Sequence, residues 1–90
     1  MAIHLIIEEY GFATSVNGPF HSAHEGFGVI YEEFDELKAE VWKKAKDRTG
    51  DALIKESKQV GAMAMRFLVD IALPLKAKEL EAIVAQGVEG

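Results

Sequence analysis

The chain has 90 residues, of which 49% are hydrophobic and 28% are charged, and it contains no cysteine. This composition argues against disorder, and the length suits a single domain over residues 1–90. The lack of cysteine excludes a disulfide framework and a thiolate zinc site, and the net charge of −5 argues against binding of nucleic acid polymers.

Nothing in the sequence predicts contact with a membrane. The apolar N-terminal segment, residues 1–12, has no basic stretch before it and no small-residue cleavage site, so it differs from a signal peptide. The apolar run over residues 60–73 contains Arg66 and Asp70 and is too short to span a bilayer. We therefore expect a soluble cytoplasmic protein.

Four helices are predicted, and no segment shows the alternation that is typical of a strand. The first covers roughly residues 2–15 and ends before the turn signal Asn-Gly-Pro at 17–19. The second begins at a capping box formed by Ser22 and Glu25. It continues to about Lys46, because apolar residues recur every three or four positions.

The third helix is predicted over about residues 51–73, with Pro74 ending it, and the fourth over about 75–86. The third is apolar on most of its sides, so one core cannot cover it. Its apolar residues include Val60, Met63, Met65, Phe67, Leu68, Val69, Ile71 and Leu73. Either the fourth helix folds back over it or a second copy of the chain covers it. We expect an all-α four-helix bundle that is completed by dimerisation or a higher homo-oligomer.

Acidic residues are concentrated in the segment EEFDELKAE, residues 32–40. Successive helical residues are about 100° apart, so Glu33, Glu36 and Glu40 share an arc of roughly 60°. This arc borders the apolar stripe of the same helix, which consists of Ile30, Phe34 and Val41. Carboxylates placed in this way repel one another, so a compensating cation is expected. Lys43 and Lys44, one turn later, can supply this positive charge by forming ordinary surface ion pairs. The alternative is a hard divalent ion such as Mg²⁺ or Mn²⁺.

Two polar residues of the third helix favour the metal. Glu56 and Gln59 share an arc with Met63 that otherwise faces inward, and burying them without partners costs roughly 1–3 kcal/mol each. If this arc packs on the acidic side of the second helix, Glu56 joins Glu33 and Glu36 around one cavity. Several carboxylate oxygens that face one another require cations.

The segments HSAHEGFGVIYEEFDELKAEV and ALIKESKQVGAMAMRFLVDI resemble the MazG-like branch of the all-α nucleoside triphosphate pyrophosphohydrolases. That family carries E-x-x-E on one helix, which Glu33 and Glu36 match, and E-x-x-D on the next, which aligns with Glu56 and Gln59. The resemblance covers roughly residues 17–72. It implies a helical bundle, commonly dimeric, that binds Mg²⁺ through these side chains. The implied reaction cleaves a nucleoside triphosphate to a monophosphate and pyrophosphate.

One position departs from this pattern, because Gln59 stands where the family has Asp and a neutral amide replaces an anionic ligand. Three outcomes are open: Glu40 supplies the missing charge, the site holds one ion fewer, or activity is lost. The last outcome defines an alternative function, a catalytically degenerate helical dimer that binds a nucleotide or a protein partner.

The expected site consists of acidic residues that bind a metal ion and basic residues that contact phosphates. The expected metal ligands are Glu33, Glu36, Glu56, Gln59 and Glu40, and the first three are also the expected catalytic residues. The expected phosphate contacts are Lys55, Lys58 and Arg66. Arg66 has a second interpretation, since Asp70 follows one turn later and can pair with it.

Overall fold

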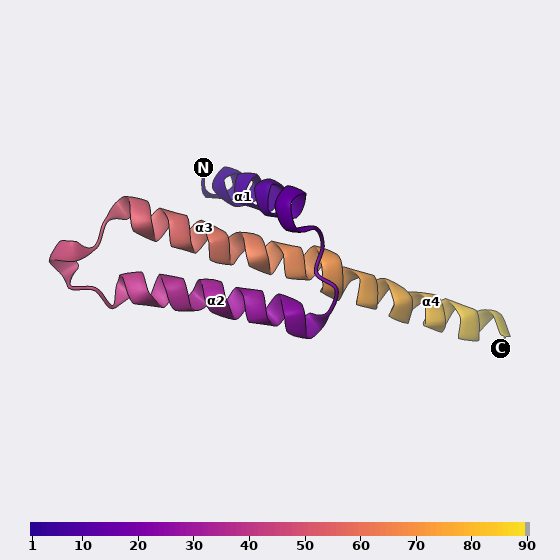
Figure 1. Cartoon of the computed structure of the whole chain (residues 1–90). Helices are drawn as coiled ribbons and strands as arrows, with labels where there is room; N and C mark the ends of the chain where they lie inside the picture. Colours follow the sequence, from indigo (N-terminus) through magenta and orange to yellow (C-terminus); the bar gives the residue numbers. More distant parts are fainter. Residues whose placement is uncertain (90) are drawn as a thin grey trace.

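The protein is described by a computed structural model that gives the backbone of residues 1–89 and the side chains of residues 1–87. Its elements are α1 (Ala2–Asn17), α2 (Ala23–Val41), the short 3₁₀ turn η1 (Ala45–Asp47), α3 (Gly50–Phe67), the π-helical segment η2 (Leu68–Ala72) and α4 (Leu73–Glu89). Residues 1–89 contain no strand, which confirms the predicted all-α class (Figure 1). No helix in this range combines the length and the apolar character needed to cross a bilayer.

Side-chain caps fix the starts of α2 and α3. The Ser22 hydroxyl accepts a hydrogen bond from the Glu25 N–H at 3.1 Å, and the Thr49 hydroxyl accepts one from the Ala52 N–H at 3.1 Å. Each bond satisfies an N–H group that has no partner within its helix. The predicted start of the second helix is confirmed, whereas the third helix begins after Thr49 and not at Asp51.

The second helix ends earlier than predicted, at Val41 instead of about Lys46. Residues 43–48 carry no large apolar side chain, so a further turn would have nothing to pack against α3. The chain instead turns through η1 and returns as α3. This hairpin places α2 and α3 side by side along most of their length (Figure 1).

α3 is the central helix, and it packs against α2 on one side and α1 on another (Figure 1). The buried apolar residues are few: Ala13, Phe20, Ala62 and Met63. Two glycines allow close helix packing. A Cβ atom on Gly26 would lie 2.7 Å from a ring carbon of Phe67, and one on Gly61 would lie 3.0 Å from Cδ1 of Ile6. The core is therefore thin and depends on short distances between helices.

The prediction that Pro74 ends the third helix is wrong, because η2 joins α3 to α4 in one continuous helical rod (Figure 1). The N–H of Leu73 bonds to the carbonyl of Leu68, five residues earlier, which is the π-helical pattern. Pro74 is the second residue of α4, where its missing N–H is tolerated. The wider π turn before it accommodates the proline ring.

The single chain does not form the expected four-helix bundle. Within residues 1–89, the substantial contacts of α4 are with η2, and the helix extends away from α1–α3 instead of folding back (Figure 1). The uninterrupted rod leaves no turn that would reverse the chain. The molecule measures 65 × 22 × 22 Å, and its radius of gyration is 17.4 Å. A compact chain of this length has a radius of gyration of about 12 Å.

Candidate metal and nucleotide site

Three carboxylates meet where α2 faces α3. Glu33 and Glu36 come from α2 and Glu56 from α3, and one oxygen of each lies within 4.8 Å of the others. Glu56 is buried, Glu33 is partly buried, and Glu36 is exposed. The structure thus brings together the three glutamates that the sequence analysis assigned to one cavity, while their roles as ligands and catalysts stay predictions.

The crowding of these acids raises two pKa values. Burial, followed by the charge and hydrogen bond of Glu36, raises the pKa of Glu33 to about 7, and Glu56 and Glu9 add to the effect. Burial also raises the pKa of Glu56, again with Glu36 as the next cause, while the charge of Lys55 opposes the shift. Burial and the neighbouring carboxylates thus favour the protonated forms of Glu33 and Glu56, and among the described residues no salt bridge offsets the charge of these two acids.

Gln59 of α3 lies between two of these acids. With its amide oriented to match donors with acceptors, its nitrogen donates to Oε2 of Glu33 at 3.0 Å and to Oε2 of Glu56 at 3.2 Å. These two bonds partly replace the missing cation. The amide oxygen then faces away from the carboxylates, so metal binding through Gln59 requires the amide to rotate by half a turn.

The remaining predicted ligand is Glu40, and the two predicted phosphate contacts besides Arg66 are Lys55 and Lys58. Glu40 accepts a hydrogen bond from Lys43 Nζ at 2.9 Å, so it forms the surface ion pair that the sequence left open as an alternative. Lys58 pairs with Glu9 of α1 at 3.7 Å. Lys55 is exposed. The metal-ligand role of Glu40 and the phosphate-contact roles of the lysines stay predictions.

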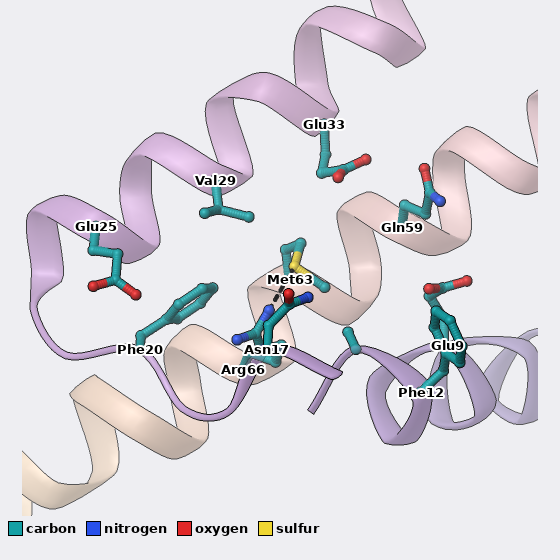
Figure 2. A pocket seen from close by; sticks show the side chains of 11 residues that line it. Glu9, Phe12, Asn17, Phe20, Glu25, Val29, Glu33, Gln59, Met63 and Arg66 are labelled. Carbon is teal, nitrogen blue, oxygen red and sulfur yellow. Dashed lines mark hydrogen bonds between the residues drawn. The ribbon is translucent and has the colours of Figure 1, made fainter. Parts of the chain in front are cut away.

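A cavity of about 460 Å³ opens beside the acids, between α1, α2 and α3 (Figure 2). Glu33 and Gln59 line one end of it, and Phe20 and Glu25 line the other. Apolar side chains, including that of Met63, form part of the wall. The lining is mixed, with six polar or charged residues and five apolar ones. The volume lies in the range of small-molecule sites, and the cavity adjoins the acidic cluster.

Arg66 is a buried cation in the wall of this cavity, with 3% of its surface exposed. Its Cζ atom lies 4.1 Å from the centroid of the Phe20 ring, and its guanidinium donates to the Gly18 carbonyl and, at 3.3 Å, to the Met63 sulfur. Asp70 instead accepts a hydrogen bond from the Phe20 N–H at 2.9 Å. Within the described residues, Arg66 Nε has no hydrogen-bond partner and no carboxylate pairs with the guanidinium. The cavity wall therefore holds an unbalanced positive charge.

One part of the cavity wall was not predicted, namely the part that α1 supplies, which includes Glu9, Phe12 and Asn17. A signal was present for Glu9. On the helical wheel it shares an arc with Leu5 and Ala13, and an acid on an apolar arc requires a partner. Nothing in the sequence indicated that this arc faces the same cavity as Glu33.

Comparison with models of protein families, with curated protein sequences and with solved structures finds no match to this chain. The resemblance to the MazG-like proteins therefore rests on the glutamate motifs themselves.

Proposed function

We propose that the protein is a Mg²⁺-dependent nucleotide pyrophosphohydrolase that cleaves a nucleoside triphosphate to a monophosphate and pyrophosphate. The observation that carries the proposal is the meeting of Glu33, Glu36 and Glu56, with an oxygen of each within 4.8 Å of the others. Two of these acids have raised pKa values, so a divalent ion would replace protons and relieve repulsion. Carboxylate oxygens suit Mg²⁺, and Mn²⁺ is the nearest substitute.

The donor set of the site fits such an ion. Glu56 and Glu33 would hold it from the interior, Glu36 would hold it from the exposed side, and the amide oxygen of Gln59 would complete the set after rotation. Once bound, the ion supplies charge neutralisation for the phosphates and a water of lowered pKa.

The residues of the chain account for binding and orientation. The cavity next to the acids accepts the nucleoside, with the ring of Phe20 and the side chain of Met63 as apolar surfaces (Figure 2). The triphosphate would then lie towards Glu33. Lys55 and Lys58 do not line the cavity itself, so as the candidate phosphate contacts they would reach the phosphates from outside it. One of the carboxylates that does not bridge ions would accept the proton of the attacking water, and Glu33, which lines the cavity, is the candidate.

The cavity wall adds a second observation in support of an electron-rich ligand. The guanidinium of Arg66 is buried without a carboxylate partner among the described residues, and its Nε has no acceptor there. A phosphate oxygen or a carbonyl of the base that contacts the guanidinium from the cavity would balance its charge.

The direct test is to incubate the purified protein with a panel of nucleoside triphosphates and Mg²⁺ and to measure pyrophosphate release. Glu33→Gln and Glu56→Gln should abolish release. Glu32→Gln, on the exposed side of the same helix, is the matched control and should retain it. Absence of pyrophosphate from every nucleotide, with a folded protein, would refute the proposal.

One observation favours a second function, the catalytically degenerate dimer that binds a nucleotide or a protein partner. The Gln59 amide already donates to Glu33 and Glu56 without any cation. Gln59→Asp removes these donors and adds a carboxylate. A gain of Mg²⁺ affinity or of turnover in this variant would indicate a degenerate metal site. If neither Mg²⁺ nor nucleotide changes the melting temperature of either protein, the chain is a scaffold without a metal site.

A further inference from the structure

α4 presents an apolar seam to solvent. Leu73, Leu80, Ile83 and Val84 are spaced so that they lie on one side of the helix, and between 50% and 65% of the surface of each is exposed. α4 continues the rod of α3 and η2, but within the described residues it has no substantial contact with α1 or α2, so a single chain leaves the seam uncovered. Because most of the stability of an amphipathic helix comes from the packing of its apolar side, the seam calls for a partner.

A second uncovered apolar surface runs along α2. It consists of Phe27, Tyr31, Phe34, Val41 and Trp42, each at least 40% exposed. On the helical wheel these five residues fall within an arc of roughly 100°. We call this surface the α2 stripe. A groove of about 350 Å³ follows its C-terminal half, lined by Phe34, Leu37 and Trp42 among others.

The α2 stripe is separate from the candidate site, since none of its five residues lines the cavity beside the acids. A partner on the stripe would therefore leave the cavity open to a nucleotide. The two helices that carry these surfaces also match in length. At 1.5 Å per residue, the 17 residues of α4 and the 19 residues of α2 extend about 25 Å and about 28 Å.

The size of the uncovered surface indicates what the partner is. The chain exposes 6670 Å², whereas a compact monomer of 9.9 kDa exposes about 5200 Å². The excess is roughly 1500 Å² for one chain and roughly 3000 Å² for two. Obligate homodimers bury about 2000–5000 Å² in total, so a second copy of this chain accounts for the whole excess.

We propose that the α4 seam of each copy packs on the α2 stripe of the other copy. A two-fold axis perpendicular to the 65 Å long axis of the molecule places two molecules side by side in opposite directions. Each α4 then lies beside the three-helix part of its partner. This arrangement is reciprocal, as a two-fold interface requires, and it covers both apolar surfaces. Pairing of one α4 with the other would cover only the seams and leave the aromatic residues of the α2 stripe in water.

Crosslinking between introduced cysteines tests this arrangement, because the chain has no cysteine of its own. Leu80 lies near the middle of α4 and Phe34 near the middle of the α2 stripe, so they face each other whichever way the helices run. Leu80→Cys protein, mixed with tagged Phe34→Cys protein and treated with a short bis-maleimide, should give a mixed dimer. Ala82→Cys, on the opposite side of α4, is the matched control and should give none.

The mass of the protein in solution gives a second test, measured by size-exclusion chromatography with light scattering over a dilution series. Wild-type protein should have the mass of a dimer. Ile83→Glu should raise the dissociation constant by about 30-fold for each of the two equivalent contacts, and thus on the order of 1000-fold for the dimer. Ala82→Glu should leave the mass unchanged, and circular dichroism should show that both variants keep their helix content.

Three results would overturn the proposal. They are a monomeric mass at every concentration, a Leu80→Cys self-crosslink without the mixed product, and equal effects of Ile83→Glu and Ala82→Glu on dimer mass. These measurements use neither nucleotide nor metal. A failure of the proposed catalysis would therefore leave their interpretation unchanged.

Discussion

Replacing Glu33 with Gln tests whether the acidic cluster lacks positive charge. The folded chain raises the pKa of Glu33 from 4.5 to about 7. Between these values the folded state binds more protons than the unfolded state, so the free energy of unfolding falls as pH rises through this window. A shift of this size in an isolated group corresponds to about 3 kcal/mol. Because part of the Glu33 side chain faces solvent, screening should reduce the effect to about 1–2 kcal/mol.

At pH 8 without metal, Glu33→Gln should therefore be more stable than the wild type by about 1–2 kcal/mol. For a chain of this length, the melting temperature should rise by roughly 5–15 °C. Below pH 4.5 the difference should vanish, because the carboxyl group is then protonated in both states of the wild type. Glu32→Gln, an exposed position one residue earlier, should change stability by less than about 0.5 kcal/mol at either pH.

The assay is urea unfolding followed by circular dichroism, in buffer with a chelator and at one chain concentration, since association also adds to stability. Equal or lower stability of Glu33→Gln at pH 8 would show that Glu33 carries a well-compensated charge. A divalent ion would then have no electrostatic repulsion to relieve at this place.

Three further predictions concern Mg²⁺ binding, the buried Arg66 and the close packing at Gly26. In a thermal melt at pH 8, Mg²⁺ at 100 times its dissociation constant should stabilise the protein by about 2.7 kcal/mol. The same Mg²⁺ concentration should stabilise it by less at pH 5, because protons compete for the same oxygens. Glu56→Gln should remove most of the stabilisation by Mg²⁺. Arg66→Met should change the free energy of unfolding by less than about 1 kcal/mol, because it replaces a buried charge without a carboxylate partner, yet it should weaken nucleotide binding about 10-fold or more in calorimetry. Arg48→Met, at an exposed arginine, is the control and should leave the free energy of unfolding and the nucleotide affinity unchanged. A similar loss of nucleotide binding in Arg48→Met would contradict a specific role for Arg66. Gly26→Ala should destabilise the protein by about 1–3 kcal/mol in urea, because its methyl group would meet two phenylalanine rings at 2.7 and 2.9 Å. Gly28→Ala, with no such atom within 4 Å, should stabilise it by about 0.5–1 kcal/mol, and equal effects of the two would contradict close packing at Gly26.

The features that the sequence predicted are those that local periodicity determines. The arc of α3 that carries Glu56 and Met63 is predicted to face inward, and the structure buries both residues. The meeting of Glu33 and Glu36 with Glu56 is predicted only on the condition that this arc packs on the acidic side of α2, and the structure meets that condition. The Ser22 cap was predictable for the same reason, because its signal spans only four residues.

The features that the sequence did not predict depend on tertiary packing. Pro74 usually ends a helix, and here the bond from Leu73 to Leu68 lets the rod continue. The direction of α4, and with it the failure of a single chain to form a four-helix bundle, follows from that one turn. Asp70 was a reasonable partner for Arg66 on spacing, but the packing of the loop directs it to the Phe20 N–H.

The cavity has two unbalanced charges of opposite sign, and this arrangement restricts what it can bind. At one end, Glu33 and the neighbouring Glu56 have raised pKa values, and among the described residues neither forms a salt bridge and Arg66 in the wall has no carboxylate partner. A free metal ion would satisfy only the acids, and a free anion only the arginine. A nucleotide that carries a divalent cation brings both groups on one molecule, and the apolar surfaces between them suit its base. Binding of nucleotide and of metal should therefore be mutually reinforcing, so that calorimetry measures tighter nucleotide binding in Mg²⁺ than in a chelator.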